Sequence, residues 1–245
     1  MPVHCISGGY ANTYVIEDGN FFVAVDVGTS KAAKKIHHSL SDRSIDVSSL
    51  QMVTATHFHI DHVGGIFRLV QLFPEIRVCF FTMVEGYLNG KERICLFSPS
   101  TWLKNLLPVI MAEDNHLSNT IASLFSDKGA IPLPFLRTKF LPSDYKAECI
   151  LDENQPIPYL PHWAIIKTPG HTDDSICFYS SDEKTLISGD TILNMKGNGE
   201  LNNFCCNPHA IKESFKKLLP LTIKNIYPGH GRPLCNLDSL SSVAQ

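Results

Sequence analysis

The chain has 245 residues, of which 44% are hydrophobic and 18% charged, an ordinary globular composition with enough apolar surface for a substantial core. The formal net charge is −3 and no block of lysines or arginines occurs, so we expect no nucleic-acid partner. No apolar run is long enough for a membrane helix, and the N-terminus lacks a signal-peptide pattern. We therefore expect a cytoplasmic protein with no membrane partner.

The first part of the chain predicts a hairpin followed by alternating helices and strands. The runs NTYVIE and FFVAVDV flank the turn Asp18-Gly19-Asn20. A helix capped by Thr29 or Ser30 follows over TSKAAKKIHHSL. The strand LQMVTAT leads directly into His57, and a helix over VGGIFRLVQLF ends at Pro74 before the strand IRVCFF.

Residues 85–161 have a different composition. They hold eight of the chain's fifteen prolines, between Pro99 and Pro161, and an apolar run over residues 94–111 that lacks strand alternation. This predicts an insertion of short helices and loops rather than sheet. The apolar run is expected either to form a lid over a site or to be buried in its own core or at a dimer contact.

Sheet patterns return after the insertion. The strand WAIIKT is followed by a hairpin of SICFYS and KTLISGD, and the last strand is IKNIYPGHG. The helix PHAIKESFKKLL has Asn207 as its N-cap and Pro208 at its first position. Strands alternate with helices in both halves, and each half has a hairpin. This predicts an α/β fold of two mixed sheets with outer helices, formed as one domain by residues 1–245.

The eight cysteines are scattered and form no Cys-x-x-Cys pair. We expect free thiols in a reducing cytosol rather than a disulfide framework, and no role for the neighbours Cys205 and Cys206. The cysteines are Cys5, Cys79, Cys95, Cys149, Cys177, Cys205, Cys206 and Cys235.

Residues of metal-binding type follow four of the predicted strands. THFHIDHVGG carries His57, His59, Asp61 and His62, and TPGHTDD, SGDT and YPGHG carry His171, Asp190 and His230. Imidazole and carboxylate groups are ligands for a divalent ion such as zinc, and an extended loop would point positions two apart in the same direction. Seven such residues exceed the need of one tetrahedral ion, and a carboxylate can bridge two, so the pattern favours a two-metal site.

With these motifs the sequence resembles the metallo-β-lactamase fold superfamily. ANTYVIEDGNFFVAVDVG resembles the family's first hairpin, and THFHIDHVGG resembles its signature metal loop. TPGHTDDS, SGDTIL and YPGHG resemble the later motifs, in the same order. The resemblance covers the chain from end to end apart from the insertion, and it implies an αββα sandwich with the metals at one edge of the two sheets.

The resemblance also implies a role for each motif residue. His57, His59 and His171 would bind the first metal, and Asp61, His62 and His230 the second. Asp190 would bridge both, and Asp26 would orient ligands from outside the coordination shell. The cofactors implied are two zinc ions per chain, with iron or manganese as alternatives. Asp61 would also be catalytic, passing a proton to the leaving group after attack by a metal-bridging hydroxide.

The substrate is a harder inference, because the superfamily hosts many chemistries. We expect a small-molecule ester, lactone or thioester with an apolar part. The metal pattern resembles acyl-homoserine lactonases, although Leu193 stands where those enzymes usually have a tyrosine. Alternatives are a phosphodiesterase, a mononuclear iron dioxygenase acting on sulfur compounds, and a metal-binding sensor without turnover. The oligomeric state is left open, with a dimer as one alternative.

Overall fold

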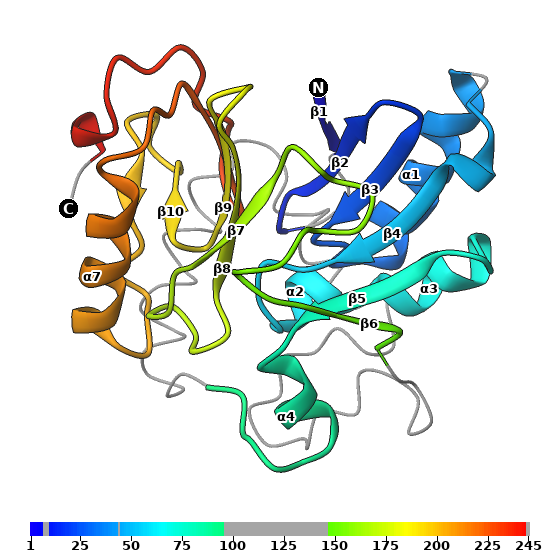
Figure 1. The fold of residues 1–245 in the computed structure, drawn as a ribbon, viewed down its shortest axis with the longest axis horizontal. Helices are drawn as coiled ribbons and strands as arrows, with labels where there is room; N and C mark the ends of the chain where they lie inside the picture. Colours follow the sequence, from blue (N-terminus) through cyan, green and yellow to red (C-terminus); the bar gives the residue numbers. More distant parts are fainter. Residues whose placement is uncertain (7–9, 44, 96–146, 244–245) are drawn as a thin grey trace.

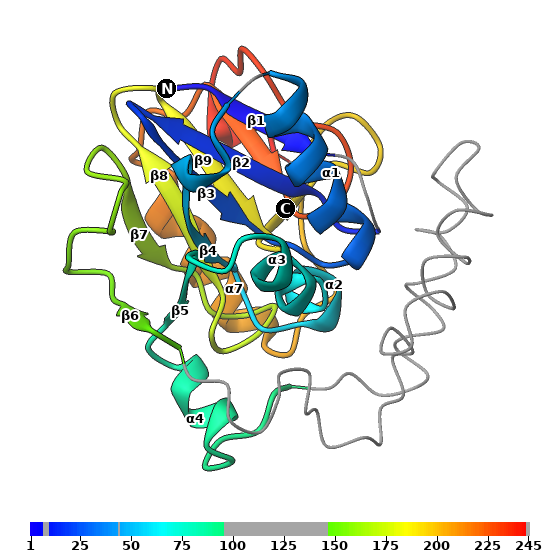
Figure 2. The same cartoon turned by 90° about the vertical axis from the view of Figure 1, so that its right-hand side faces the viewer.

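The computed structural model describes residues 1–6, 10–43, 45–95 and 147–243. Figure 1 shows these residues arranged in four layers. A six-stranded sheet and a four-stranded sheet face each other, and each carries helices on its outer side. In the view turned by 90°, α1 (Ser30–Asp42) and α3 (Ile66–Leu72) lie in front of the sheets and α7 (Pro208–Leu218) lies behind them (Figure 2). The predicted αββα sandwich is therefore confirmed.

The first sheet has the strand order β1-β2-β3-β4-β5-β6. Strands β1, β2 and β3 pair antiparallel, and the pairs β3–β4, β4–β5 and β5–β6 are parallel. The sheet is therefore mixed, as predicted. Its strands are β1 (Val3–Ile6), β2 (Thr13–Asp18), β3 (Phe21–Val25), β4 (Leu50–Thr54), β5 (Arg77–Phe81) and β6 (Cys149–Leu151).

The second sheet has the order β12-β9-β8-β7. β12 pairs parallel with β9, and β8 pairs antiparallel with both β9 and β7, so this sheet is also mixed. A separate short pair joins β10 (Ile192–Leu193) to β11 (Glu200–Leu201). The strands of the sheet are β7 (Ala164–Lys167), β8 (Ile176–Ser180), β9 (Thr185–Gly189) and β12 (Asn225–Pro228).

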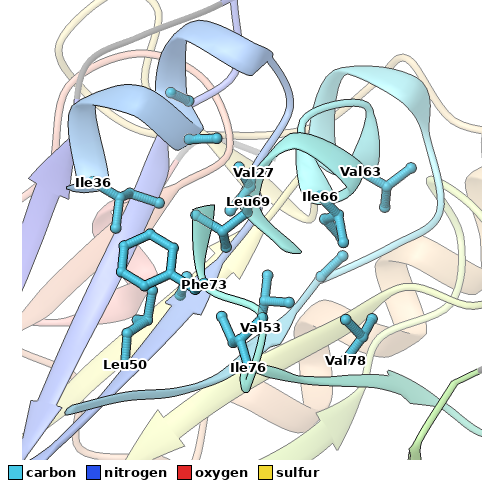
Figure 3. Packing of buried hydrophobic residues seen from close by; sticks show 14 of the residues in the cluster. Val27, Ile36, Leu50, Val53, Val63, Ile66, Leu69, Phe73, Ile76 and Val78 are labelled. Atoms are coloured by element: carbon cyan, nitrogen blue, oxygen red, sulfur yellow. The ribbon is translucent and has the colours of Figure 1, made fainter. Parts of the chain in front are cut away.

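Helices α1, α3 and α7 each bury an apolar face against a sheet. Thr29 begins α1 by accepting a hydrogen bond from the Ala32 N–H, as the sequence predicted. Ile36 of α1 and Leu69 of α3 are fully buried over the first sheet (Figure 3). The described helices are α1 (Ser30–Asp42), α2 (Ile60–Val63), α3 (Ile66–Leu72), α4 (Val84–Leu88) and α7 (Pro208–Leu218), with single 3₁₀ turns at Val47–Ser49 and Leu240–Ser242.

Three apolar clusters separate the four layers. The middle cluster fills the space between the sheets with fully buried side chains such as Tyr14, Met52 and Phe178. Phe215 and Leu218 of α7 close the outer face of the second sheet. Burying a side chain of this size contributes roughly 1.5–3 kcal/mol to stability. The three clusters therefore stabilise the sandwich that carries the loops of the site. Among the described residues, no helix is long and apolar enough to cross a membrane.

The prediction of helices and loops alone for residues 85–161 is wrong at its C-terminal end. Cys149–Leu151 form β6, a parallel edge strand on β5, and Leu151, Ile157 and Leu160 are buried in the cluster between the sheets. The helix α4 agrees with the prediction. Most of the apolar run proposed as a lid lies outside the described residues, apart from Ile94 and Cys95.

The expectation of free thiols is wrong for four of the eight cysteines. Cys79 is disulfide-bonded to Cys149, its direct neighbour in the register of β5 and β6. Cys95 is bonded to Cys206, for which the sequence predicted no role. A strand pair can place two side chains face to face across 70 positions of sequence, and this proximity leaves no mark in cysteine spacing. The free cysteines are Cys5, Cys177, Cys205 and Cys235.

Candidate metal centre

The predicted site residues follow strands that end at the same edge of the sandwich. In the first sheet, β3 and β4 run parallel and lead to Asp26 and to the His57 loop. In the second sheet β7, β9 and β12 share one direction and lead to His171, Asp190 and His230. Two backbone bonds join the sheets at this edge. The Ile176 N–H donates to the carbonyl of Thr56, and the Asn12 N–H donates to that of Gly229.

Three histidines converge as one group. Nδ1 of His59 lies 3.1 Å from Nε2 of His57 and 3.2 Å from Nε2 of His171. His57 and His59 come from the loop after β4 and His171 from the loop after β7, so each sheet contributes to the group. His57 and His171 are buried and His59 is partly exposed, which leaves the group accessible from one side.

Asp61, His62 and His230 form a second group beside the first. Oδ2 of Asp61 lies 3.4 Å from Nε2 of His230 and 3.8 Å from Nε2 of His62. Asp190 lies between the groups. Its Oδ2 is 3.4 Å from Nε2 of both His171 and His230, and its Oδ1 is 3.5 Å from Nε2 of His62. The structure thus brings together all seven residues that the sequence proposed as ligands.

These separations fit two divalent ions. Ligand atoms 2.0–2.1 Å from a tetrahedral ion are about 3.3 Å apart, close to the distances measured here. Within the described residues, Nε2 of His62 and Oδ1 of Asp190 are buried without a hydrogen-bond partner, although they face each other. A buried polar atom without a partner is costly in free energy, and a bound cation would satisfy both.

The second ring nitrogen of each histidine faces an acceptor. Nε2 of His59 contacts the carbonyl of Cys95 at 3.2 Å, and Nδ1 of His171 contacts the carbonyl of Phe204 at 2.6 Å. A carbonyl can only accept, so these nitrogens carry the proton and the inward nitrogens keep their lone pairs for a metal. The remaining contacts are His57 Nδ1 to Thr56 Oγ1, His62 Nδ1 to Asp26 Oδ2 and His230 Nδ1 to the Tyr10 carbonyl, at 3.0–3.2 Å.

Asp26 has the supporting position that the sequence predicted. It is fully buried and adopts a φ of 59°, which is unfavourable for a residue with a side chain. In this conformation Oδ1 accepts the Thr56 N–H at 2.7 Å, and Oδ2 accepts the Thr56 hydroxyl at 2.8 Å. Asp26 thereby fixes the backbone immediately before His57 and orients the His62 ring.

The charges divide the site into two halves. Burial lowers the pKa of His59 to about 4, with help from neighbouring histidines, and burial also lowers the pKa of His57 and His171. Burial acts in the same direction on His62, but the carboxylates of Asp26, Asp61 and Asp190 raise its pKa to about 9. The first group is therefore neutral and ready to bind a cation. In the second group, burial would lower the pKa of His230 as well, but Asp190 and Asp61 raise it well above its usual value. A cation bound there would take the place of the protons on His62 and His230.

Two further residues shape the site and were not found from the sequence. Asn202 donates through Nδ2 to the carbonyl of Asp190 at 2.9 Å and accepts the Phe204 N–H at 2.8 Å, which holds the acceptor of His171 in place. Asn12 donates to the carbonyls of Pro228 and Gly231, which flank His230. Asparagines are common in loops for other reasons, so no sequence signal distinguishes these two.

A disulfide lies next to the first group of histidines. The carbonyl of Cys95 accepts from His59, and the Cys206 N–H donates to the carbonyl of His171 at 3.1 Å. The bond between Cys95 and Cys206 therefore joins the two backbone segments that support two of the three ligands.

Comparisons with known proteins agree with this geometry. The probable metallo-hydrolase YflN of Bacillus subtilis is 24% identical over 99% of this chain and 89% of its own length, in line with the predicted enzyme class. The atrochrysone carboxyl ACP thioesterase of Aspergillus fumigatus is 24% identical over 93% of this chain and 52% of its own length. The crystal structure of the BLEG-1 B3 metallo-β-lactamase superposes with a TM-score of 0.62 at 20% identity, covering 96% of this chain and 94% of the other.

The family follows from the sequence match. The model of the metallo-β-lactamase superfamily matches residues 6–80 and 105–230, which is most of the chain and includes every residue of the metal centre. The resemblance predicted from the five motifs is confirmed. The chain belongs to the metallo-β-lactamase superfamily.

Proposed function

We propose that this protein is a dinuclear zinc hydrolase of a small acyl ester, lactone or thioester. The observation that carries the proposal is the position of Asp190, whose carboxylate lies 3.4 Å from a histidine of each ligand group. The completeness of the second group favours two ions over the single iron of a dioxygenase. A thioesterase among the relatives supports an acyl substrate.

The residues divide the work between binding the ions and moving protons. When bound, two divalent cations would supply Lewis acidity and make hydroxide available at neutral pH. The seven side chains would hold both ions, and the carbonyls of Cys95 and Phe204 would keep His59 and His171 in the right tautomer. Asp61 is the partly exposed acid of the set, so its carboxylate can take a proton and pass it to a leaving group.

The apolar part of the substrate is inferred from residues 94–111. This run begins beside the metal centre, because the carbonyl of Cys95 contacts His59. The apolar composition of this run supports a substrate with an acyl chain. We also propose that the enzyme acts on a small molecule, without a nucleic-acid or membrane partner.

The test combines metal analysis with a substrate panel. Elemental analysis of the untagged protein should give two zinc ions per chain, and a chelator should abolish activity that added zinc restores. His57→Ala and Asp190→Ala should each lose metal and lower kcat by at least about 100-fold. Lys212→Ala on α7 serves as the control. Unchanged metal content and turnover in both site variants would refute the proposal.

The panel separates the alternatives. Nitrophenyl acetate and octanoate, an acyl lactone, an acyl thioester and bis-nitrophenyl phosphate would be assayed in parallel. We expect turnover of the acyl compounds with a lower KM for the longer chain. Turnover of the phosphodiester alone would instead assign a phosphodiesterase, and one iron per chain would assign the dioxygenase.

A further inference from the structure

Asp174 is a buried carboxylate three positions after His171 that the proposed chemistry does not use. Its side chain is fully buried, whereas its neighbour Asp173 is exposed. Burial raises the pKa of Asp174 to about 6, so the residue is maintained at a cost in stability. A buried carboxyl group of this kind is costly unless hydrogen-bond donors replace the water that it loses.

Its first partner is the backbone of the metal loop. Oδ2 of Asp174 accepts the Phe58 N–H at 2.7 Å, and that N–H lies between the ligands His57 and His59. Asp174 itself lies in the loop that carries His171. One carboxylate therefore spans the two loops that supply the first ligand group. The only other direct backbone bond described between these segments is from the Ile176 N–H to the Thr56 carbonyl, on the other side of His57.

Its second partner belongs to α4, at the start of the insertion. The hydroxyl of Tyr87 donates to Oδ1 of Asp174 at 3.4 Å. The Phe58 ring packs edge-on against Phe80 at 5.3 Å between centroids and lies 6.2 Å from the Tyr87 ring. α4 and the metal loop thus share one carboxylate and one aromatic contact.

We propose that Asp174 is a positioning residue that sets the separation between His171 and the pair His57 and His59, and that Tyr87 links this separation to α4. The inference rests on the metal centre of the proposed function. Without the carboxylate, the Phe58 N–H would be buried without an acceptor and the loop would shift to find one. The inward nitrogens, now 3.1–3.2 Å apart, would then no longer match one ion.

Cobalt(II) in place of zinc provides the test, because its visible spectrum reports the ligand field directly. Asp174→Ala should weaken cobalt binding in chelator competition by about 10–100-fold and change the spectrum of the bound ion. Asp173→Ala is the matched control and should leave both unchanged. Asp174→Asn keeps an acceptor for Phe58 and should restore most of the affinity. Tyr87→Phe should have a smaller effect in the same direction.

Each outcome has a defined meaning. If Asp174→Ala does not fold, Asp174→Ser replaces it, because serine is polar but too short to reach the Phe58 N–H. A folded Ala or Ser variant with the spectrum and chelator midpoint of the wild type would overturn the positioning role while leaving the metal centre intact. A wild-type chain that binds no cobalt would overturn the metal centre, and this role with it.

Discussion

At the scale of single residues, the chemistry of the site depends on backbone atoms, which are the same in every residue type. Two ligands, His59 and His171, are oriented by backbone carbonyls of Cys95 and Phe204, and His230 by that of Tyr10. Any residue type can supply a carbonyl. The positions of these acceptors therefore depend on the path of the chain, and substitutions that move the backbone should act on the site more strongly than substitutions that change these side chains.

Gly229 gives a direct test at this scale. A Cβ at this position would lie 2.1 Å from Oδ1 of Asp190 and 3.0 Å from the His62 ring. Gly229→Ala should displace the shared carboxylate, so we expect loss of at least one of the two ions by elemental analysis and a fall in kcat of about 100-fold or more.

Gly19→Ala is the comparison for that variant. Its Cβ would meet nothing within 4 Å, but its φ of +62° makes a side chain unfavourable, at roughly 1 kcal/mol. This variant should lose stability in thermal unfolding and keep its metal. If Gly229→Ala also retained two ions and full turnover, the close packing of Gly229 against Asp190 would have no effect on the metal centre.

The cluster of candidate ligands could be predicted from the sequence, and the residues that support it could be predicted only in part. His57, His59, Asp61 and His62 lie within six positions, a density of metal-binding groups that packing alone does not require. Asp26 could be predicted because a family motif marks it. The contact between Asp174 and Phe58 joins positions 116 apart, and no local pattern encodes such a pair.

At the scale of elements, prediction succeeded where a periodic pattern was reinforced by a boundary residue. α1 is capped by Thr29, one of the two predicted candidates, and α7 has Asn207 and Pro208 where expected. It failed for elements too short to show a period. β6 has three residues and β10 has two, so their pairing is decided by the neighbouring strand rather than by their own sequence.

The cap of α7 should have a measurable effect on stability. Oδ1 of Asn207 accepts the N–H groups of His209 and Ala210, and α7 covers the second sheet through Phe215. Asn207→Ala should lower the free energy of unfolding by about 1 kcal/mol in a urea titration, because two N–H groups lose their acceptor. The exposed Lys212→Ala should change it by less than about 0.5 kcal/mol. Equal values for the two variants would contradict the cap.

At the scale of the whole molecule, the mixed sheets and outer helices followed from the alternation of strands and helices along the chain. The placement of the metal motifs at one edge of the two sheets was implied by the resemblance to the family. The contribution of residues 147–160 to the core between the sheets could not be predicted, because the prolines of this region resemble those of a loop. Burial of Leu151 depends on its pairing with Phe81 of β5.

The two disulfides alternate along the chain. Cys79 pairs with Cys149 and Cys95 pairs with Cys206, so the segment between Cys95 and Cys149 lies inside both covalent rings. A single protease cleavage site introduced there should give two fragments that migrate as one species without reductant and as two species after reduction. Cys79→Ser or Cys95→Ser alone should leave the fragments joined, and the two changes together should release them. Separation of the wild-type fragments without reductant would contradict the pairing.

Such a cut would also divide the ligand set. His57, His59, Asp61 and His62 would remain on the N-terminal piece, and His171, Asp190 and His230 on the C-terminal piece. The cleaved protein would then be a two-chain molecule in which neither polypeptide holds a complete set of ligands for either ion. The alternating sulfur bonds would keep both sets of ligands within one particle, so loss of chain continuity in the insertion need not mean loss of the catalytic centre.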